Sequence, residues 1–432
     1  MSAPSSGQGK TAVTLGLLRA FRRFGVDVAS GKSGPDYIDP AFHRAATGKE
    51  CVTLDGWAMD ADSLRGRSVE SSSALTIVEG AMGLFDGPVA SKESGSPVPG
   101  STAHLALRLG LPVVVVLDAR RMGQSAGALI HGLSSWSPGL RVEAVILNQV
   151  ASPRHEAMLR RSVEQTCPVL GVIPADPRLA MPSRHLGLVQ ASEMAELEAF
   201  LECAADVVSQ HCDLDALLDL SMPLLPSGLV RRLPPLGHRV SVAQDVAFAF
   251  CYPHLLEDWR QQGAEISFFS PLADQAPAAD CDAVYLPGGY PELHAHALAN
   301  AVTFLDGLRT AAQKNKLLYG ECGGYMVLGN ALIDADGKSH TMAGLLSLET
   351  SFAERKRHLG YRRLEPLSGP WAAAPVGALA AHEFHYSTVV RAEGDALFRA
   401  SDAGGVAIPE MGLVNGNVMG SFAHVIGPMT GH

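Results

Sequence analysis

The sequence predicts an α/β fold in two domains. The chain has 432 residues, which is more than a single hydrophobic core usually holds. Short apolar runs alternate with helical stretches in both halves, and a proline-rich segment without sustained periodicity lies between them. We therefore expect a first domain at 1–212, a linker at 213–238 and a second domain at 239–432.

The apolar runs of the first domain indicate a parallel sheet with helices on both faces, because strands that are buried on both faces read as continuous apolar segments. These runs are 26–30, 75–81, 111–119 and 142–150. The second domain repeats the pattern, and we expect strands at 246–252, 264–270, 282–289 and 316–324.

Composition excludes several classes of protein. The formal net charge is −10 and the basic residues are not gathered into blocks, so nucleic acid is not expected as a partner. The seven cysteines contain no C-x-x-C pair, which argues against a zinc site or a disulfide framework and favours a reducing cytoplasm. No apolar run has the length of a membrane span and no signal pattern opens the chain. We expect a cytoplasmic protein that does not bind membranes.

The segment SSGQGKTAVTLGLLRAF, residues 5–21, has the features of a phosphate loop followed by a helix. Gly7 and Gly9 would let backbone N–H groups approach phosphate oxygens, Lys10 supplies a positive charge, and the Thr11 hydroxyl suits Mg²⁺. The strict pattern has glycine where this chain has Pro4. A glycine-rich loop that only caps a helix is therefore the alternative.

The start of the chain departs from the expected pattern. A phosphate loop follows a buried strand of about five or six residues, yet only four residues precede Ser5. We expect that Met1–Ala3 is the end of a strand whose beginning lies upstream, because a missing central strand would leave two unpaired edges and a hole in the core. A fragment with defective ATP binding is the alternative.

Acidic residues follow two predicted strands of the first domain. Asp36 and Asp39 lie in one turn, and Glu79 and Asp86 lie at and beyond the end of another strand. Carboxyl ends of parallel strands meet at one edge of a sheet, so these side chains are expected to converge on the phosphate loop and to favour Mg²⁺. Lys32 is expected to pair with a phosphate or a substrate carboxylate. Solvated loop acids and a surface lysine are the simpler alternatives.

Cys322 lies in a Gly-x-Cys-x-Gly turn, within GECGGYMVLG, between an apolar run and a helical stretch. Small flanking residues allow a sharp turn that presents the side chain above the sheet, as in the serine nucleophile elbow. A position at the start of a helix is also expected to stabilise the thiolate. We therefore interpret Cys322 as a nucleophile, whereas a packed core thiol is the favoured interpretation of the other six cysteines.

A nucleophilic cysteine needs a base and an oxyanion site. His424, in the segment 415–427, is the candidate base, although a structural histidine is the alternative. Backbone N–H groups for the oxyanion are expected from Gly288 and Gly289, which follow a predicted strand, and from Gly323, which follows the nucleophile.

These motifs occur in one order along the chain, together with GPDYIDPAFH, VEGAMGLFDG, LPGGYPELHA and HEFHYS. Over essentially its whole length the chain resembles the cobyrinate and hydrogenobyrinate a,c-diamide synthases. These are glutamine-dependent amidotransferases of cobalamin biosynthesis, related to cobyric acid synthase. The resemblance implies a phosphate-loop domain similar to dethiobiotin synthetase, followed by a class I glutaminase-like α/β domain.

The resemblance implies that the first domain transfers phosphate from ATP to an acetate carboxylate of the corrin ring, giving an acyl phosphate. Lys10 and the loop amides would neutralise the phosphate charge, and Tyr37 and Asp86 would help to position the substrate. The implied Mg²⁺ ligands are Thr11, Glu79 and one of Asp36 or Asp39.

In the second domain the resemblance implies that Cys322 attacks the amide of glutamine and that His424 shuttles protons. The released ammonia would travel along an enclosed path to the acyl phosphate. Class I glutaminases often carry glutamate two residues after the histidine, where this chain has Ile426. Glu383 is the candidate acid that orients His424 instead, with a structural role as the alternative.

The predicted activity is ATP- and glutamine-dependent amidation of the a- and c-carboxylates of hydrogenobyrinic acid. Within the family, the segment SFAERKRHLGYRR, residues 351–363, resembles the hydrogenobyrinate branch, and this resemblance implies the metal-free substrate instead of cobyrinic acid. The alternatives are a cobyrinate enzyme, a cobyric acid synthase and a non-catalytic regulatory module that binds nucleotide. A homodimer is the expected alternative to a monomer.

Overall fold

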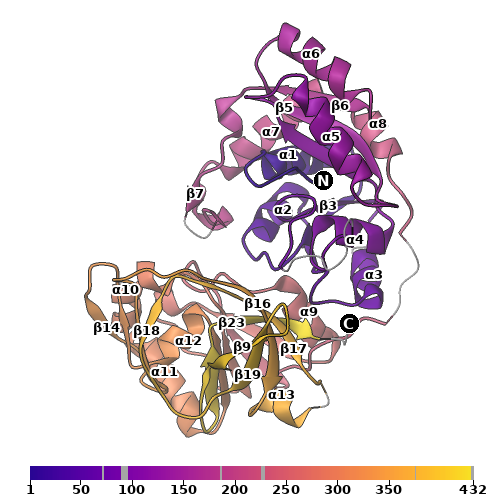
Figure 1. Ribbon diagram of the computed structural model, residues 1–432. Helices are drawn as coiled ribbons and strands as arrows, with labels where there is room; N and C mark the ends of the chain where they lie inside the picture. The colour runs from indigo at the N-terminus through magenta and orange to yellow at the C-terminus, as the bar shows by residue number, and fades with distance from the viewer. Residues whose placement is uncertain (71–72, 89–95, 185–186, 225–228, 375, 430–432) are drawn as a thin grey trace. The chain divides into compact units, whose positions relative to one another are not determined.

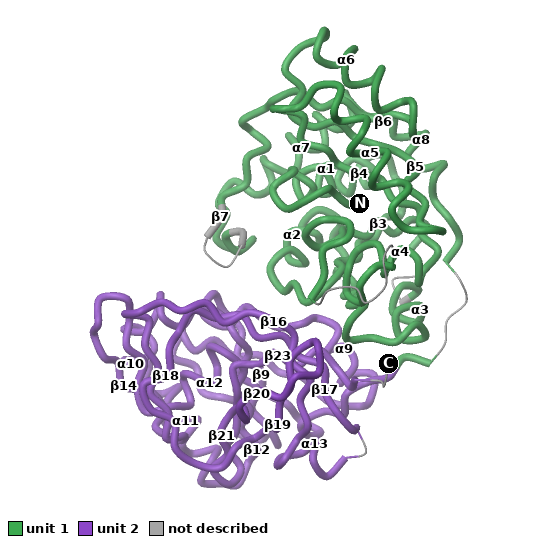
Figure 2. Tube along the Cα trace, viewed as in Figure 1, with its two compact units in different colours: residues 1–230 green, residues 231–432 purple. Residues whose placement is uncertain are grey.

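The structure is a computed structural model, and it describes all residues except 71–72, 89–95, 185–186, 225–228, 375 and 430–432 (Figure 1). The chain divides into two compact units, Met1–Val230 and Arg231–His432 (Figure 2). The division falls inside the segment that we expected to be a linker. Part of that segment is structured, because helix α8 (Leu214–Asp219) belongs to the first unit.

The first unit, called unit 1, contains two three-stranded parallel sheets with the orders β2-β1-β3 and β4-β5-β6. Their strands are β1 (Val28–Ser33), β2 (Val52–Leu54), β3 (Leu75–Glu79), β4 (Val113–Asp118), β5 (Val142–Val150) and β6 (Val169–Pro174). The small pair β7 (Ser183–Arg184) and β8 (Gly187–Leu188) is antiparallel. The predicted strands at 26–30, 75–81, 111–119 and 142–150 correspond to β1, β3, β4 and β5, and the α/β class is confirmed.

The longer helices of unit 1 alternate with its strands. They are α1 (Lys10–Arg23), α2 (Asp39–Thr47), α3 (Ala61–Glu70), α4 (Thr102–Leu109), α5 (Ser125–Ser135), α6 (Pro153–Val163) and α7 (Leu197–His211). Helix α1 buries a continuous series of residues from Ala12 to Phe21 and packs against α7. Gly16 of α1 permits this packing, because a Cβ there would lie 2.7 Å from the carbonyl oxygen of Ala204 on α7.

The three N-terminal residues join the two sheets of unit 1. The terminal amine donates to the carbonyl oxygen of Val78 at 2.7 Å, and the N–H of Gly80 donates to the Met1 carbonyl at 2.8 Å. On the other side, Ser2 pairs in parallel with Val115. Residues Met1–Ala3 therefore lie between β3 and β4.

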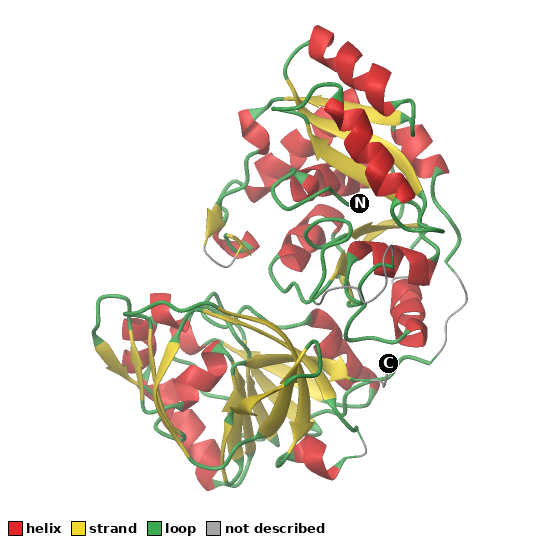
Figure 3. Cartoon of the chain, viewed as in Figure 1, coloured by secondary structure: helices red, strands yellow, loops and turns green. Residues whose placement is uncertain are grey.

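The second unit, called unit 2, is rich in strands (Figure 3). Its central sheet has the order β10-β9-β11-β12-β22-β21 and is parallel except for β21. These strands are β9 (Arg239–Ala243), β10 (Glu265–Phe269), β11 (Ala283–Leu286), β12 (Leu317–Glu321), β21 (Leu413–Asn415) and β22 (Val418–Ser421).

Two further sheets complete unit 2. One has the order β14-β13-β15-β18, with β13 (Ala331–Ile333), β14 (Ser339–Thr341), β15 (Ser347–Ser351) and β18 (Thr388–Glu393). The other has the order β20-β19-β16-β17-β23, with β16 (His358–Pro366), β17 (Leu379–His385), β19 (Phe398–Asp402), β20 (Ala407–Met411) and β23 (Ala423–Pro428). The helices are α9 (Pro253–Gln261), α10 (Ala295–Asn300), α11 (Val302–Gln313), α12 (Gly323–Leu328) and α13 (Pro370–Ala373).

One predicted strand of unit 2 is wrong. The segment 246–252 is a buried loop, and the first strand of the sheet is β9 (Arg239–Ala243). The loop turns at Asp245, whose side chain accepts a 2.9 Å hydrogen bond from the N–H of Ala247. Its apolar residues pack beneath the loop that follows β11, since a Cβ on Gly289 would lie 1.9 Å from the carbonyl oxygen of Ala247. In the described part of the chain the only strand-like pairing of the segment is an isolated bridge between Phe250 and Gly288, so burial in a loop accounts for the apolar run.

None of the helices in the described part of the chain has the length and hydropathy of a membrane span.

Candidate functional site

The phosphate loop of unit 1 contains two glycines with left-handed backbone angles. Gly7 and Gly9 have φ values of 81° and 82°, a region that side chains other than glycine rarely occupy. A Cβ on Gly9 would also lie 2.3 Å from the side-chain nitrogen of Asn148. That nitrogen donates to the carbonyl oxygen of Gln8 at 3.0 Å. Helix α1 begins directly after the loop, so its free N–H groups point toward the space where a phosphate would bind.

Glu79, at the end of β3, is the centre of the polar cluster in unit 1. Its side chain is fully buried. Oε1 accepts hydrogen bonds from Thr11 Oγ1 at 2.7 Å and from Lys32 Nζ at 3.0 Å, and Oε2 lies 2.7 Å from Nε2 of His43. Burial by itself would raise the pKa of Glu79, but Lys32 and His43 outweigh it and hold the pKa well below its usual range.

Lys32 connects Glu79 to the two aspartates. Its ammonium contacts a carboxylate oxygen of Asp39 and lies 3.6 Å from Oδ2 of Asp36. Burial would lower the pKa of Lys32, but the three carboxylates hold it well above its usual value. The predicted residues Thr11, Lys32, Asp36, Asp39 and Glu79 thus form one connected group. The three carboxylates already surround a cation, which shows that this donor set suits positive charge.

Lys10, Tyr37 and Asp86 lie around this group. Lys10 Nζ donates to the carbonyl oxygen of Met82 at 3.0 Å, in the loop that follows β3. In the same loop Asp86 accepts a 2.9 Å hydrogen bond from the N–H of Gly83, so its carboxylate shapes the turn. Tyr37 is buried between Asp36 and α2. A role of Tyr37 and Asp86 in holding substrate stays a prediction.

Two polar residues of this site were not singled out from the sequence. His43 is one turn after Asp39 on α2, a spacing that places both on the same face of the helix. Asn148 belongs to β5 and contacts the phosphate loop. The four-residue spacing of Asp39 and His43 in GPDYIDPAFH could have indicated that both lie on one face of a helix. Asn148 is far from the phosphate loop in the sequence, so only the fold shows that the two are in contact.

In unit 2 the predicted elbow at Cys322 is present between β12 and α12. Cys322 has a φ of 47° and a ψ of −103°, a strained conformation for a residue with a side chain. Its N–H donates to the carbonyl oxygen of Ser421 at 2.8 Å. The flanking glycines permit close packing, because a Cβ on Gly324 would lie 1.9 Å from the carbonyl oxygen of Leu286.

Cys322 and His424 converge on Gly288. A Cβ placed on Gly288 would lie 2.2 Å from Cε1 and 3.0 Å from Nε2 of His424, and 3.2 Å from Cβ of Cys322. A Cβ on Gly323 would lie 3.1 Å from the backbone nitrogen of Gly289. Gly289 and Gly323, two of the three glycines that we expected at the oxyanion site, are therefore close together beside Cys322. That the N–H groups of Gly288, Gly289 and Gly323 bind an oxyanion stays a prediction.

Cys322 and His424 are both neutral at rest. Burial raises the pKa of the Cys322 thiol far above its usual value, and Glu292 adds to the effect. Burial also lowers the pKa of His424 to about 3, with contributions from His382 and His385. The expected stabilisation of the thiolate by the helix is outweighed, because a helix terminus contributes only about 0.3–1 kcal/mol, whereas full burial shifts a pKa by up to about 3–5 units.

Glu321, the residue before Cys322, was not singled out from the sequence. Its buried carboxylate accepts hydrogen bonds from the hydroxyls of Tyr285 at 2.7 Å and Tyr319 at 3.1 Å. It also accepts a 3.0 Å hydrogen bond from the N–H of Val425, and Oε2 lies 3.9 Å from Nδ1 of His424. Glu321 is therefore an acidic residue positioned beside His424.

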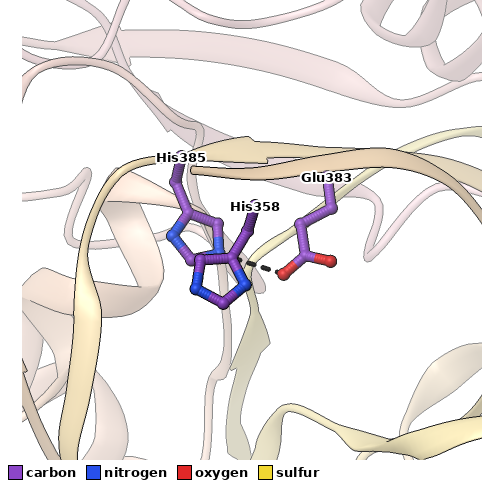
Figure 4. A group of neighbouring side chains, drawn as sticks. All are labelled: His358, Glu383 and His385. Carbon is purple, nitrogen blue, oxygen red and sulfur yellow. Dashed lines mark hydrogen bonds and ion pairs between the residues drawn. The ribbon is translucent and has the colours of Figure 1, made fainter. Parts of the chain in front are cut away.

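Glu383, the acid that we expected beside His424, has other close contacts. One carboxylate oxygen accepts hydrogen bonds from Arg362, with Nε at 2.8 Å, and the other lies 3.0 Å from Nε2 of His385. Figure 4 shows this pair with His358, whose ring stacks on His385 at a centroid distance of 4.7 Å. His385 also stacks on Phe422 at 4.0 Å. An orienting role for Glu383 stays a prediction.

Two protein-family models match the chain. The model described as the CobQ/CobB/MinD/ParA nucleotide binding domain matches residues 1–189. The model described as the CobB/CobQ-like glutamine amidotransferase domain matches residues 239–428. The first match contains the phosphate loop and its carboxylates, and the second contains the elbow, the histidine and the glycines around them.

Curated relatives cover nearly the whole chain. It is 55% identical over 435 residues to the hydrogenobyrinate a,c-diamide synthase of Brucella abortus biovar 1, an alignment that includes 99% of this chain and 97% of the relative. Proteins with the same name from Sinorhizobium sp and Rhodobacter capsulatus are 53% identical over 434 residues and 50% identical over 432 residues. Both alignments include 99% of this chain and 98% of the relative.

Proposed function

This chain belongs to the family of hydrogenobyrinate a,c-diamide synthases, and from that membership we propose that it amidates the a- and c-acetate carboxylates of hydrogenobyrinic acid. ATP activates each carboxylate and glutamine supplies the nitrogen. The observation that carries this proposal is that one chain combines a phosphate loop backed by buried carboxylates with a cysteine elbow that meets a histidine. A regulatory module would need neither a strained nucleophile nor its base.

In unit 1 the carboxylate of the corrin side chain attacks the terminal phosphate of ATP, and an acyl phosphate and ADP form. The N–H groups of the phosphate loop and Lys10 stabilise the charge on the transferring group. Oxygen atoms of Thr11, Asp36, Asp39 and Glu79 fit Mg²⁺, which when bound would shield the negative charge of the phosphates. Ammonia then attacks the acyl carbon, and phosphate leaves as the amide bond forms.

In unit 2 the Sγ of Cys322 attacks the side-chain amide carbon of glutamine. A carbon–sulfur bond forms, and the oxyanion accepts hydrogen bonds from the N–H groups of Gly289 and Gly323. His424 moves the thiol proton to the departing nitrogen, so ammonia leaves as the carbon–nitrogen bond breaks. Water then hydrolyses the thioester and releases glutamate. Because both groups are neutral at rest, proton transfer to His424 accompanies the attack on glutamine.

We propose the metal-free corrin acid as the substrate because the relatives at 50–55% identity carry that name. The cytoplasm is the proposed location. It supplies ATP and glutamine, and it keeps thiols such as the seven free cysteines reduced.

The experiment that tests the proposal is mass spectrometry of the products. The purified chain is incubated with ATP, Mg²⁺ and either glutamine or a high ammonia concentration. Hydrogenobyrinic acid and cobyrinic acid are supplied in parallel. Cys322→Ala is compared with Cys281→Ala, a matched variant at a buried cysteine of the same unit.

Two amidations of hydrogenobyrinic acid are expected. In Cys322→Ala they should disappear with glutamine and persist with ammonia, whereas Cys281→Ala should behave like the unaltered chain. Amidation of cobyrinic acid alone would show that the cobalt-containing compound is the substrate. Nucleotide binding without any amidation would contradict the proposal.

A further inference from the structure

His43 and Cys51 lie behind Glu79 in the polar cluster of unit 1, and the proposed reaction uses neither of them. Nε2 of His43 lies 2.7 Å from Oε2 of Glu79. On the other side of the imidazole ring, Nδ1 lies 3.6 Å from Sγ of Cys51. His43 and Glu79 are fully buried, and Cys51 is only 3% exposed. The three side chains therefore form a continuous row inside unit 1, and one end of that row is the carboxylate beside the phosphate loop.

This row joins three elements of unit 1. His43 belongs to α2, Glu79 is the last residue of β3, and Cys51 directly precedes β2. In their sheet, β2 and β3 lie on opposite sides of β1. The backbone of His43 is held in the helix, where the hydroxyl of Thr47 donates to its carbonyl oxygen at 3.0 Å. The imidazole is thus fixed between contacts to both neighbours of β1.

The direction of the hydrogen bond between His43 and Glu79 follows from the chemistry of the carboxylate. Glu79 pairs with the ammonium of Lys32 at 3.0 Å, as an ionised carboxylate does. An ionised carboxylate only accepts hydrogen bonds. Nε2 of His43 therefore carries a hydrogen and donates it to Oε2, whether the ring is neutral or charged. The contact with Cys51 occupies the other ring nitrogen.

The two carboxylate oxygens of Glu79 have different partners. Oε1 is on the side of the phosphate loop, where it accepts a hydrogen bond from Thr11 Oγ1 at 2.7 Å. Oε2 is on the side of His43. Without the imidazole, Oε2 would lose this donor inside the protein, where an unsatisfied acceptor is costly. The carboxylate could regain a donor only by turning, and a turn would move Oε1 away from Thr11.

We propose that His43 is a positioning residue for phosphate transfer: it fixes the Glu79 carboxylate so that Oε1 is presented to Mg²⁺ beside Thr11, and Cys51 fixes the ring of His43. This role rests on the proposed function, which gives Glu79 a metal ion to bind. Carboxylates that bind metal ions are themselves held by hydrogen bonds, and loss of such a partner typically lowers metal affinity by roughly 10- to 100-fold.

The simpler alternative is that His43 only fills space between α2 and the sheet. Filling depends on the volume of the side chain, and phenylalanine has a ring of similar size. Positioning depends instead on the N–H donor. Glutamine supplies such a donor at about the reach of Nε2, because its amide nitrogen is also separated from Cβ by two atoms. His43→Phe and His43→Gln therefore separate the two roles.

Calorimetry measures the binding of a non-hydrolysable ATP analogue to these variants, without glutamine or corrin substrate. Each dissociation constant is determined with Mg²⁺ and again with EDTA in place of Mg²⁺, so that the contribution of the metal ion is separated from that of the phosphate loop. Thr47→Val is the matched control, because it removes a buried hydrogen bond of the same helix that does not involve Glu79.

With Mg²⁺ present, His43→Phe should bind the analogue roughly 10- to 100-fold more weakly than the unaltered chain. With EDTA the two should bind it equally, because the loop amides do not depend on Glu79. His43→Gln and Thr47→Val should bind like the unaltered chain under both conditions.

Cys51 provides a second test that leaves His43 in place and decides the question if His43→Phe does not fold. Cys51→Ala removes the sulfur beside Nδ1, so binding with Mg²⁺ should weaken several-fold. Cys51→Ser keeps a group that can form a hydrogen bond with Nδ1 and should bind like the unaltered chain. Circular dichroism reports whether each variant is folded. Unweakened binding by Cys51→Ala would contradict the role of Cys51.

Unchanged binding of the analogue by His43→Phe in the presence of Mg²⁺ would overturn the positioning role of His43. An equal loss in His43→Phe and Thr47→Val would do the same, because it would indicate packing of α2 alone. A loss that persists with EDTA would show that the whole loop is deformed. Failure of the proposed function is distinguishable, since the unaltered chain itself would then bind the analogue no better with Mg²⁺ than with EDTA.

Discussion

The carboxylate of Glu321 lies beside the imidazole of His424: Glu321 directly precedes Cys322 in the chain, and its Oε2 lies 3.9 Å from Nδ1 of His424. Its other oxygen accepts the N–H of Val425 at 3.0 Å. Strand β12 and strand β23 are thereby held together next to Cys322 and His424, the residues that we propose carry catalysis. An acid in this position can orient the imidazole and stabilise the imidazolium that forms as the thiol is deprotonated.

Replacement of Glu321 by glutamine should lower the turnover of glutamine. The glutamine side chain keeps the shape but turns part of an acceptor into a donor that faces the N–H of Val425. The loss of the negative charge beside the imidazolium removes an interaction of the kind that contributes about 1.5–3 kcal/mol. Because the imidazolium forms only as the thiol is deprotonated, we expect roughly a 10- to 150-fold decrease in kcat. Glutaminase kinetics measure this, and ammonia-dependent amidation should be unchanged. Glu257→Gln on α9, where the side chain is exposed, is the control; an equal loss in both variants would argue against the assigned role.

Stability should also depend on the protonation of Glu321. Burial raises the pKa of Glu321 from 4.5 to about 7, and the hydrogen bond from Val425 opposes this only in part. The folded state therefore binds a proton more tightly than the unfolded state. The contribution of protonated Glu321 to the free energy of unfolding is complete below pH 4.5, and it is lost as the pH rises through about 7.

Chemical denaturation across this pH range, monitored in unit 2, should show the unaltered chain losing roughly 3 kcal/mol relative to Glu321→Gln. A difference in the free energy of unfolding that stayed constant at all pH values would show that the pKa of Glu321 is not raised in the folded protein.

Cys322→Gly should be more stable than Cys322→Ala. Both variants lack the thiol and are inactive with glutamine. Only alanine keeps a Cβ at a φ of 47°, a strain of about 1–3 kcal/mol. Thermal unfolding of the two variants measures the difference. If alanine proved equal to glycine or better, the elbow would not be strained in solution.

Gly288→Ala should abolish glutamine use while leaving amidation from ammonia intact. The added methyl would lie 2.2 Å from Cε1 of His424, so the imidazole must move, and displacement by about 1 Å can cost a hundredfold in rate. Gly427→Ala is the matched control, because a Cβ there meets no atom within 4 Å. Similar rates for the two variants would show that His424 tolerates displacement.

Thr11→Val should lower amidation with either nitrogen donor by about a hundredfold, because it removes the hydroxyl that contacts Glu79 beside the phosphate loop. Thr11→Ser retains the hydroxyl and should keep most of the activity. Hydrolysis of glutamine, measured without corrin substrate, is expected to survive in both variants. Full activity of the valine variant would exclude the hydroxyl from the site.

Local patterns predicted much of the fold and of both sites. Continuous apolar runs predicted β3, β4 and β5, and the glycines around Cys322 predicted the elbow. Both patterns could be recognised because they involve residues that are neighbours in the sequence. The apolar run at 246–252 was predicted to be a strand but is a loop. A buried loop is apolar for the same reason as a buried strand. A strand forms only where a partner edge is available, and an apolar run does not reveal one.

Contacts between distant residues could not be predicted in this way. His43 meets Glu79 across 36 positions, and Glu321 meets Val425 across 104. The charge states also depended on the fold. A cysteine at the start of a helix suggests an activated thiolate, but α12 has only six residues and the thiol is buried. The cost of desolvation then exceeds the attraction of the helix.

The burial of the neutral Cys322 thiol should protect it from oxidation and alkylation. Peroxides and alkylating agents react with thiolates that solvent can reach. Cys322 is 3% exposed and protonated at rest, so it is shielded from both during the intervals when glutamine is scarce. Cys322 should therefore remain unoxidised during oxidative stress. Iodoacetamide should inactivate the glutamine-dependent activity slowly.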